Sequence, residues 1–260
     1  MGRVESHLLA EIKKHGAIHL TLIDPDKENP RSASEKTEQS ERGGTTAVLV
    51  GGSTAASTSH VDEIVRSIKK RSTVPVILFP SNVTGISRYA DAIWFMSLLN
   101  SSNPYFITGA QALGAPLVKK YNIEPISMGY LIIGDGGTAA FIGQANPIPY
   151  DHPEIAAIYA LAAQYLGIHF VYLEAGSGVK RPVPCEMIKL VRKTIAIPMI
   201  VGGGLRSSEN ARKVVEAGAD VIVTGTVVEN TLPIESKIRE LVQGIRVARR
   251  NWVQTGVKAY

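Results

Sequence analysis

The sequence has a single cysteine, Cys185, among its 260 residues. One cysteine cannot form an internal disulfide, and this scarcity is typical of proteins that work in a reducing compartment. Long apolar runs are also missing, because no stretch approaches the roughly 20 residues that a membrane-spanning helix needs. The first residues lack the apolar stretch of a secretory signal peptide. These absences predict a cytoplasmic protein.

Motifs of several common chemistries are absent as well. The six histidines show no metal-ligand spacing, and no Ser/His/Asp arrangement or nucleophile elbow is present. No nucleic-acid-binding motif accompanies the net charge of +5, so we expect no nucleic-acid partner. A basic balance also suits anionic small molecules or an anionic membrane surface. The cluster of Arg246, Arg249 and Arg250 beside Trp252 fits a solvated helix end or a peripheral membrane contact.

What is present is a regular alternation of short β-rich runs and helix-like segments. Several of the runs are continuously apolar, as expected for parallel strands that are buried on both faces. The runs are residues 17–24, 45–52, 74–80, 92–99, 124–133, 168–176, 197–204 and 220–226. Helix-like segments lie at 61–70, 104–120, 153–166, 184–194, 207–217 and 232–250. This order predicts an α/β protein with a (βα)₈ TIM barrel, one domain over residues 1–260 with a short N-terminal helix.

Two intervals depart from the regular pattern. Residues 81–91 are too few for a crossover helix with two loops, so the third helix is expected to be missing or irregular. Residues 134–152 form a long segment that we expect to be structureless, and such loops are often lids or binding loops. A gap in the outer ring and a lid together suit a long ligand.

The ends of the seventh and eighth runs carry glycines. The seventh run ends with Gly203 and Gly204, and the eighth ends with Gly225 and Thr226. Glycines let the backbone approach a ligand closely, and the loops after strands 7 and 8 are where TIM barrels bind phosphate. The pattern predicts a phosphorylated substrate, with tight turns alone as the alternative.

Carboxylates follow the first and sixth runs. Asp24 at the barrel mouth is a candidate Mg²⁺ ligand, because Mg²⁺ usually takes one or two carboxylates together with phosphate oxygens and waters. Ser53, after the second run, adds a hydroxyl for a diphosphate; turn or cap roles are the alternatives for both residues. Glu174 ends the sixth run beside a glycine-rich turn, where packing explains a carboxylate poorly. We expect it to hold a substrate hydroxyl, unless it forms a buried ion pair with Lys180 or Arg181.

The combined motifs resemble geranylgeranylglyceryl phosphate synthase, the prenyltransferase family of the first ether bond in archaeal membrane lipids. The motifs are LIDPDK, LVGGST, YLEAGSG, VGGGLRS and VTGT, and the resemblance covers nearly the whole chain. Leu22 stands where some relatives carry a lysine, which resembles the family's second branch. The resemblance implies transfer of a geranylgeranyl group from its diphosphate to the 3-hydroxyl of sn-glycerol 1-phosphate, with Mg²⁺ and release of diphosphate.

The resemblance also implies roles for particular residues. Asp24 and Ser53 would lie at the Mg²⁺–diphosphate site, and Glu174 would orient the acceptor hydroxyl and take its proton. The residues that would surround glycerol phosphate are Tyr172, Leu173, Glu174, Ala175, Gly176, Ser177, Gly178, Gly203, Gly204, Gly225 and Thr226.

Other functions remain open at the level of the sequence. An isomerase or aldolase of sugar or indole phosphates would need a second acid/base or a strand-end lysine, and a flavin barrel would share the phosphate loops. A non-catalytic phosphate-binding protein is a further alternative. The apolar, glycine-punctuated helix over residues 104–118 predicts a homo-oligomer contact, with packing on the barrel as the alternative.

Overall fold

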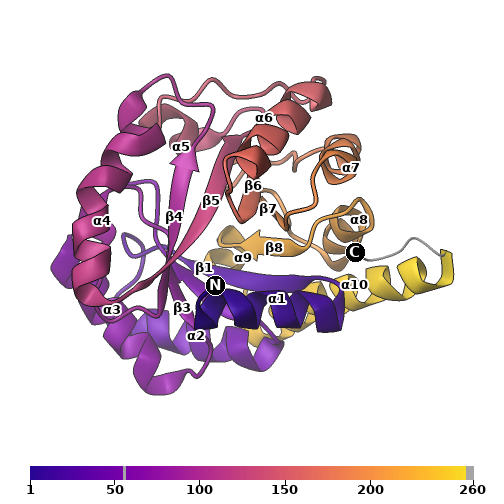
Figure 1. Cartoon of the computed structure of the whole chain (residues 1–260). Coiled ribbons are helices and arrows are strands. Elements are labelled where there is room, and N and C mark those ends of the chain that lie inside the picture. Colours follow the sequence, from indigo (N-terminus) through magenta and orange to yellow (C-terminus); the bar gives the residue numbers. More distant parts are fainter. Residues whose placement is uncertain (55–56, 256–260) are drawn as a thin grey trace.

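Eight parallel strands pair in sequence order, and the last pairs with the first, so the sheet is a closed barrel (Figure 1). This computed structural model describes residues 1–54 and 57–255, without the side chains of residue 230 and residues 249–255. The strands are β1 Ile18–Ile23, β2 Ala47–Val50, β3 Val76–Leu78, β4 Ala92–Leu98, β5 Glu124–Ile132, β6 Phe170–Glu174, β7 Met199–Gly202 and β8 Val221–Thr224. All eight lie within the predicted runs, and the TIM barrel is confirmed.

Helices surround the barrel. They are α1 Arg3–His15, α2 Pro30–Gly43, α3 Thr58–Arg71, α4 Ala110–Tyr121, α5 Gly137–Ile142, α6 Pro153–Tyr165, α7 Cys185–Thr194, α8 Ser208–Glu216, α9 Thr226–Asn230 and α10 Ile234–Thr255. A short 3₁₀ helix, η1 (Val83–Gly85), and a π-helix, η2 (Tyr105–Gly109), complete the described elements. Helix α2 was not predicted from the sequence, because it is polar on most of its surface, although it begins with a recognisable cap. There Asn29 accepts a hydrogen bond from the N–H of Ser32 and Pro30 occupies the first turn.

The two irregular intervals have different outcomes. Between β3 and β4 the described helix is only η1, so the prediction of a missing or irregular third helix is confirmed. The prediction of a structureless 134–152 segment is wrong, because α5 lies within it. Isolated bridges between Ile133 and Ile148, and between Ser101 and Ala145, tie this segment to the barrel. The glycines and prolines of residues 134–152 indicate a loop, so the sequence pattern does not predict the short helix α5.

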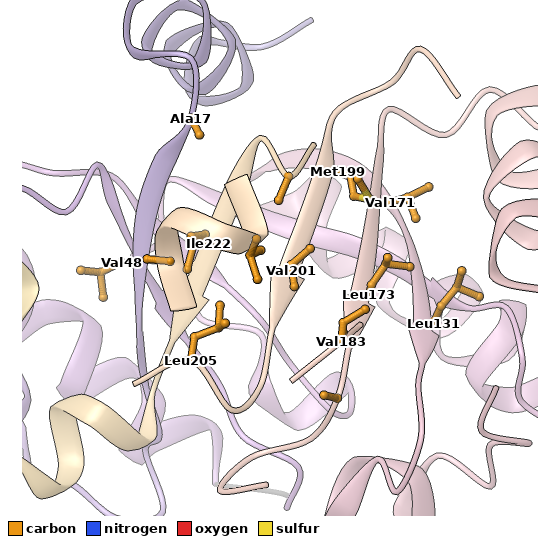
Figure 2. Close-up of a cluster of buried hydrophobic side chains, with 14 of the residues drawn as sticks. Ala17, Val48, Leu131, Val171, Leu173, Val183, Met199, Val201, Leu205 and Ile222 are labelled. Atoms are coloured by element: carbon orange, nitrogen blue, oxygen red, sulfur yellow. The ribbon is translucent and has the colours of Figure 1, made fainter. Parts of the chain in front are cut away.

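Side chains alternate between the two faces of each strand, which gives two packed layers. Outward-facing residues such as Leu131, Leu173 and Val201 pack beneath the helices (Figure 2). Inward-facing residues such as Phe170 and Tyr172 fill the barrel interior, and α1 adds Leu8 to this interior cluster at the N-terminal end. The alternation along β6 therefore directs Tyr172 and Glu174 inward.

A buried polar cluster joins the first and last strands on their outer side. His19, only 1% exposed, has its Nδ1 3.1 Å from Thr45 Oγ1 and its Nε2 2.9 Å from Thr224 Oγ1. Burial lowers the pKa of His19 to about 3, so the ring is neutral at physiological pH. This places His19 among the structural histidines, as the absence of ligand spacing predicts.

The helices of residues 1–54 and 57–255 include none with both the length and the apolar character of a bilayer span.

Candidate active site

A pocket of about 200 Å³ opens at the carboxyl ends of the strands. Segments that follow each of the eight strands contribute to its lining, as is usual for the catalytic face of a TIM barrel. The predicted site residues that line it are Asp24, Ser53, Tyr172, Glu174, Ser177, Gly178, Gly203, Gly204, Gly225 and Thr226. Segments about 200 residues apart in the sequence thus meet in one cavity.

Three predicted residues lie beside the pocket without lining it. Leu173 and Ala175 are fully buried in the outward-facing core cluster, so their side chains do not reach the pocket. The N–H of Gly176 donates to Glu174 Oε1 at 2.7 Å. In this structure the Gly176 N–H therefore orients the carboxylate, and a contact of Gly176 with glycerol phosphate stays a prediction.

Glu174 is a buried carboxylate at the inner wall of the pocket, with 7% of its surface exposed. Burial raises its pKa, and hydrogen bonds from the Gly176 N–H and from the Tyr172 and Tyr130 hydroxyls oppose this rise. The described residues show no ion pair between Glu174 and Lys180 or Arg181, so the alternative of a buried salt bridge is not realised. Glu174 is instead held by neutral donors, which leaves its charge free for chemistry.

Tyr130 and Tyr172 stand side by side because β5 and β6 pair them directly in register. Burial and the neighbouring carboxylate raise the pKa of both hydroxyls well above the usual value near 10. Both phenols therefore stay protonated, and Glu174 is the member of this trio able to accept a proton. Phe79 packs against both rings, with centroids 5.6 Å and 5.7 Å away, and fixes their orientation.

Gly203 shows why this wall needs glycine. Its φ is +87°, and a Cβ there would lie 2.8 Å from both Glu174 Oε1 and the Gly176 nitrogen. A side chain would therefore be strained and would collide with the carboxylate. The loops after β6 and β8 also meet here, with Ser177 Oγ 3.3 Å from Thr226 Oγ1.

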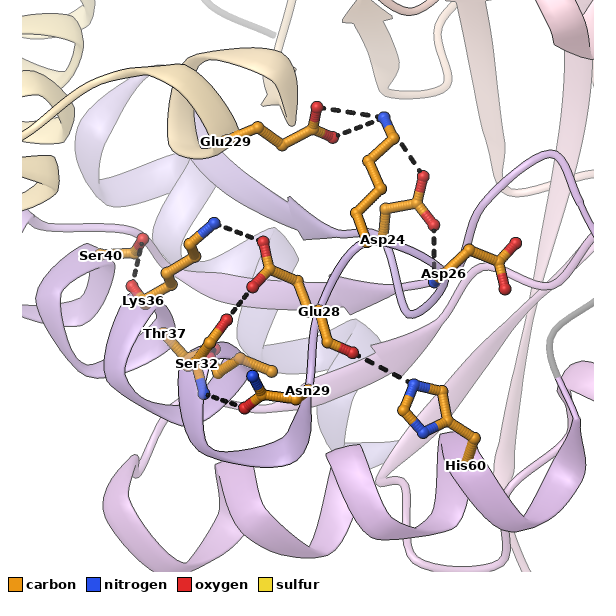
Figure 3. A network of polar contacts seen from close by, with 12 residues as sticks. Asp24, Asp26, Glu28, Asn29, Ser32, Lys36, Thr37, Ser40, His60 and Glu229 are labelled. Atoms are coloured by element: carbon orange, nitrogen blue, oxygen red, sulfur yellow. Dashed lines mark hydrogen bonds and ion pairs between the residues drawn. The ribbon is translucent and has the colours of Figure 1, made fainter.

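Asp24, which directly follows β1, also lines the pocket. Figure 3 shows its polar contacts. Its Oδ1 accepts the N–H of Asp26 at 3.1 Å, and its Oδ2 lies 3.4 Å from Lys27 Nζ. Burial raises the pKa of Asp24, while those two partners act in the opposite direction. A Cβ on Gly52 would come within 2.5 Å of Asp24 Oδ1, so glycine at this position makes room for the carboxylate.

The loop that carries Asp24 is held by side chains from neighbouring helices (Figure 3). His60 on α3 has its Nε2 2.8 Å from the Pro25 carbonyl oxygen and 3.1 Å from that of Glu28. Both partners are acceptors, so Nε2 carries the proton. Glu28 is itself buried and paired with Lys36 and Ser32 of α2. The position of Asp24 is therefore set by two helices outside the pocket.

An apolar arm extends the pocket toward the gap between β3 and β4, where the outer ring lacks a regular helix. Phe95, Met96 and Phe106 line it together with Gly114 of α4, and Val83 and Ile86 line it from the η1 segment. Gly114 faces Ile86, whose Cδ1 would lie 3.1 Å from a Cβ at this position. The sequence favours a core role for such aromatics individually and an apolar channel near the gap for some of them. Phe95 and Phe106 line the pocket, in agreement with that expectation.

Three further residues of the site were not predicted from the sequence as functional groups. Tyr130 carried a weak signal, because inward alternation along its strand aligns it with Tyr172. Lys27 and Glu229 form an ion pair, with Nζ 2.9 Å and 3.0 Å from the two carboxylate oxygens, although 202 residues separate them. No local pattern predicts that pair, since it depends on barrel closure.

Comparison with known proteins identifies the family. Residues 10–245 match the PcrB family, a span that covers most of the chain. The chain belongs to the PcrB family. This PcrB-family chain is 56% identical over 250 residues to the geranylgeranylglyceryl phosphate synthase of Thermococcus gammatolerans, covering 95% of this chain and 99% of that protein. It is 50% identical over 245 residues to the enzyme of the same name from Thermofilum pendens, covering 94% and 96%.

A solved structure agrees with these relatives. The PcrB-family chain matches the crystal structure of (S)-3-O-geranylgeranylglyceryl phosphate synthase from Thermoplasma acidophilum in complex with substrate sn-glycerol-1-phosphate. The TM-score is 0.90 at 39% identity, covering 95% of this chain and 99% of that one. The resemblance drawn from the sequence motifs is thereby confirmed.

Proposed function

We propose that this chain transfers a geranylgeranyl group from geranylgeranyl diphosphate to the 3-hydroxyl of sn-glycerol 1-phosphate, the reaction that forms the first ether bond of archaeal-type membrane lipids. The observation that carries the proposal is a single pocket with two unlike parts. A polar end contains Glu174 and the glycine loops after β7 and β8, and an apolar arm leads to the gap in the helical ring. A phosphate-bearing acceptor and an apolar donor require this combination. The names of the relatives support it.

The polar end suits glycerol phosphate by the groups that line it. Backbone N–H groups around Gly204 and Thr226 would bind the phosphate, as helix N-termini and glycine turns do in other barrels. Glu174 would then accept a hydrogen bond from the hydroxyl at the far end of the same molecule. The two neutral tyrosines hold the carboxylate in that direction.

The chemical step balances within this geometry. The bond between the allylic carbon and the diphosphate oxygen breaks, and diphosphate leaves with the electron pair. The acceptor oxygen forms the new C–O bond and its proton passes to Glu174. Because a hydroxyl is a weak nucleophile, holding it beside the allylic carbon supplies much of the rate.

A magnesium requirement is part of the proposal. No group of three or more His, Cys, Asp or Glu suited to a metal occurs within residues 1–54 and 57–255. The partly buried Asp24 carboxylate nevertheless fits an ion that substrate oxygens and waters also ligate, the usual mode of Mg²⁺. Asp24, with Ser53 beside it, would hold the ion, which when bound supplies charge neutralisation for the departing diphosphate.

The test is incubation of the purified protein with sn-glycerol 1-phosphate and a series of prenyl diphosphates, from geranyl through farnesyl and geranylgeranyl to the next longer homologue, with and without Mg²⁺. We expect an ether-linked product, fastest with the geranylgeranyl donor, and loss of turnover in EDTA. Binding of glycerol phosphate without consumption of any donor would favour a non-catalytic phosphate-binding protein. A yellow protein with bound flavin, or turnover of sugar phosphates, would favour the other barrel chemistries.

Assembly and location are further parts of the proposal. We also propose that the chain forms a homo-oligomer through the helix over residues 104–118. Gly114 of this helix faces Ile86 of the same chain, which supports packing on the barrel as the alternative. Arg249, Arg250 and Trp252 of the proposed membrane contact lie outside the described side chains, and Arg246 of the same cluster is exposed. Light scattering after size exclusion would test the first proposal, and sedimentation with anionic vesicles the second. The cytoplasmic location stays a prediction from the single cysteine.

A further inference from the structure

Three carboxylates line the pocket that two anionic substrates are proposed to enter. Asp24, Glu174 and Glu229 all contribute to its wall. Carboxylates that face phosphate oxygens repel them, so a cation is required where they meet. Leu22 also lines the pocket and contributes no charge to it.

Lys27 is not itself a lining residue of the pocket, but both of its ion-pair partners, Asp24 and Glu229, are. Its Nζ contacts both oxygens of Glu229 and lies 3.4 Å from Asp24 Oδ2. Asp24 follows β1, and Glu229 belongs to α9 behind the Gly225–Thr226 turn. The Lys27 side chain therefore connects the loop after β1 with helix α9, which follows β8.

This ion pair is a poor candidate for a purely structural contact. The Lys27 side chain is 48% exposed, and exposed pairs of this kind contribute little to stability. The ammonium group sits on a flexible four-carbon stem, so it can exchange one oxygen partner for another at little cost. A phosphate group bound in the pocket carries more negative charge than a single carboxylate.

We propose that Lys27 is a substrate-binding residue for a phosphate oxygen, and that Glu229 holds it at the pocket rim until the anion arrives. The idea rests on the proposed function but adds a residue that the sequence motifs do not assign. The ligand source is either the diphosphate of the prenyl donor or the phosphate of the acceptor. Because Glu229 competes with the ligand for the lysine, the two side chains have opposite effects on anion binding.

The experiment compares Lys27→Met and Glu229→Gln by calorimetry with inorganic pyrophosphate and, separately, with sn-glycerol 1-phosphate. We expect Lys27→Met to weaken binding of one of them by about 10- to 100-fold, the range for a lost charge-assisted hydrogen bond. We expect Glu229→Gln to tighten binding of the same ligand by roughly threefold or more, because it frees the lysine. In the double variant the gain from Glu229→Gln should vanish. The ligand that responds identifies the source.

The Glu209–Lys213 pair of α8 is a matched control, since it is an exposed ion pair of 2.7 Å outside the pocket lining. Lys213→Met and Glu209→Gln should leave both Kd values unchanged. If Lys27→Met and Glu229→Gln shift binding in the same direction, or neither shifts it, the proposal is wrong and the pair is structural. Failure of the wild-type protein to form the ether product would instead overturn the proposed function, because pyrophosphate binding is measured without turnover.

Discussion

At the residue scale, the defining feature is a carboxylate surrounded by neutral donors. Glu174 keeps its charge in a buried wall because an N–H and two hydroxyls face it, without a cation to quench its basicity. Burial raises the pKa of Glu174, so the carboxylate is a stronger base than an exposed one. Two predictions belong to this scale.

Replacement of the carboxylate by an amide tests the proton acceptor. In Glu174→Gln we expect kcat to fall by about 10²- to 10⁴-fold, the usual contribution of a general base. The KM for glycerol phosphate should change only a few-fold, since an amide still accepts a hydrogen bond from the hydroxyl. Steady-state kinetics decide the matter, with the exposed Glu186→Gln as control. Retained turnover would show that Glu174 only orients the acceptor.

The pH profile tests the environment of the same group. The base must be ionised, so kcat should fall as pH drops through the raised pKa of Glu174. Tyr130→Phe removes a hydrogen bond that favours the ionised form, which raises that pKa further. We expect the acidic limb of the kcat profile to move upward by roughly one pH unit. Tyr165→Phe, at an exposed position, should leave the limb in place, and an unmoved limb in Tyr130→Phe would contradict the assignment.

At the element scale, the strands aim the side chains and the loops after them control access. The turn after β7 brings Gly203 against Glu174 with a φ that other residues rarely adopt. Gly167 has a similar φ of +78°, but a Cβ added to it would meet nothing within 4 Å. The two glycines therefore share their backbone strain and differ in their surroundings.

A paired substitution separates these effects. Gly167→Ala should destabilise the fold by about 1–2 kcal/mol, because alanine is strained at positive φ. Gly203→Ala should destabilise it by more, because its Cβ also lies 2.8 Å from backbone atoms of Gly176. Only Gly203→Ala should also lower kcat, by roughly tenfold or more, since its methyl group displaces the carboxylate. Urea unfolding and kinetics on both variants provide the measurement. Equal losses of activity would place the effect in stability alone.

The elements and the site differ in how far the sequence predicts them. All eight strands follow from apolar runs, and Glu174 follows from its place at the end of one of them. The orienting role of Gly176 does not, because its N–H faces either a phosphate or the carboxylate depending on the turn. Lys27 and Glu229 meet only after the barrel closes, and α5 forms in a segment whose composition indicates a loop. Local patterns thus predict which residues end strands, whereas partners fixed by closure need the structure.

At the scale of the whole molecule, a buried histidine stabilises the closure between β1 and β8. His19 bridges Thr45 and Thr224 in its neutral form. Its folded-state pKa of about 3 lies below the ordinary 6.5, so the unfolded chain binds the extra proton between those values. Stability from this group is therefore fully present above pH 6.5 and is lost as pH falls toward 3.

Acid unfolding tests this contribution. Because of His19, we expect the free energy of unfolding of the wild-type protein to fall by up to about 1.4 kcal/mol for each pH unit below 6.5. His19→Gln should be less stable at pH 7 but lose less stability between roughly pH 6.5 and 4. Urea titrations across that range give the two slopes, with the exposed His7→Gln as control. Parallel slopes in His19→Gln and wild type would assign acid sensitivity to other groups.

The pairing of the first strand with the last also has a consequence during synthesis. Asp24 is translated about 200 residues before Thr226 and Glu229, which lie on the other side of the β1–β8 junction. A chain that ends before β8 therefore has the residues that follow β1 but not those that follow β8. It lacks a complete binding site for the phosphorylated substrate. Substrate becomes able to stabilise the folded state only once the segment from β8 to α9 has been synthesised.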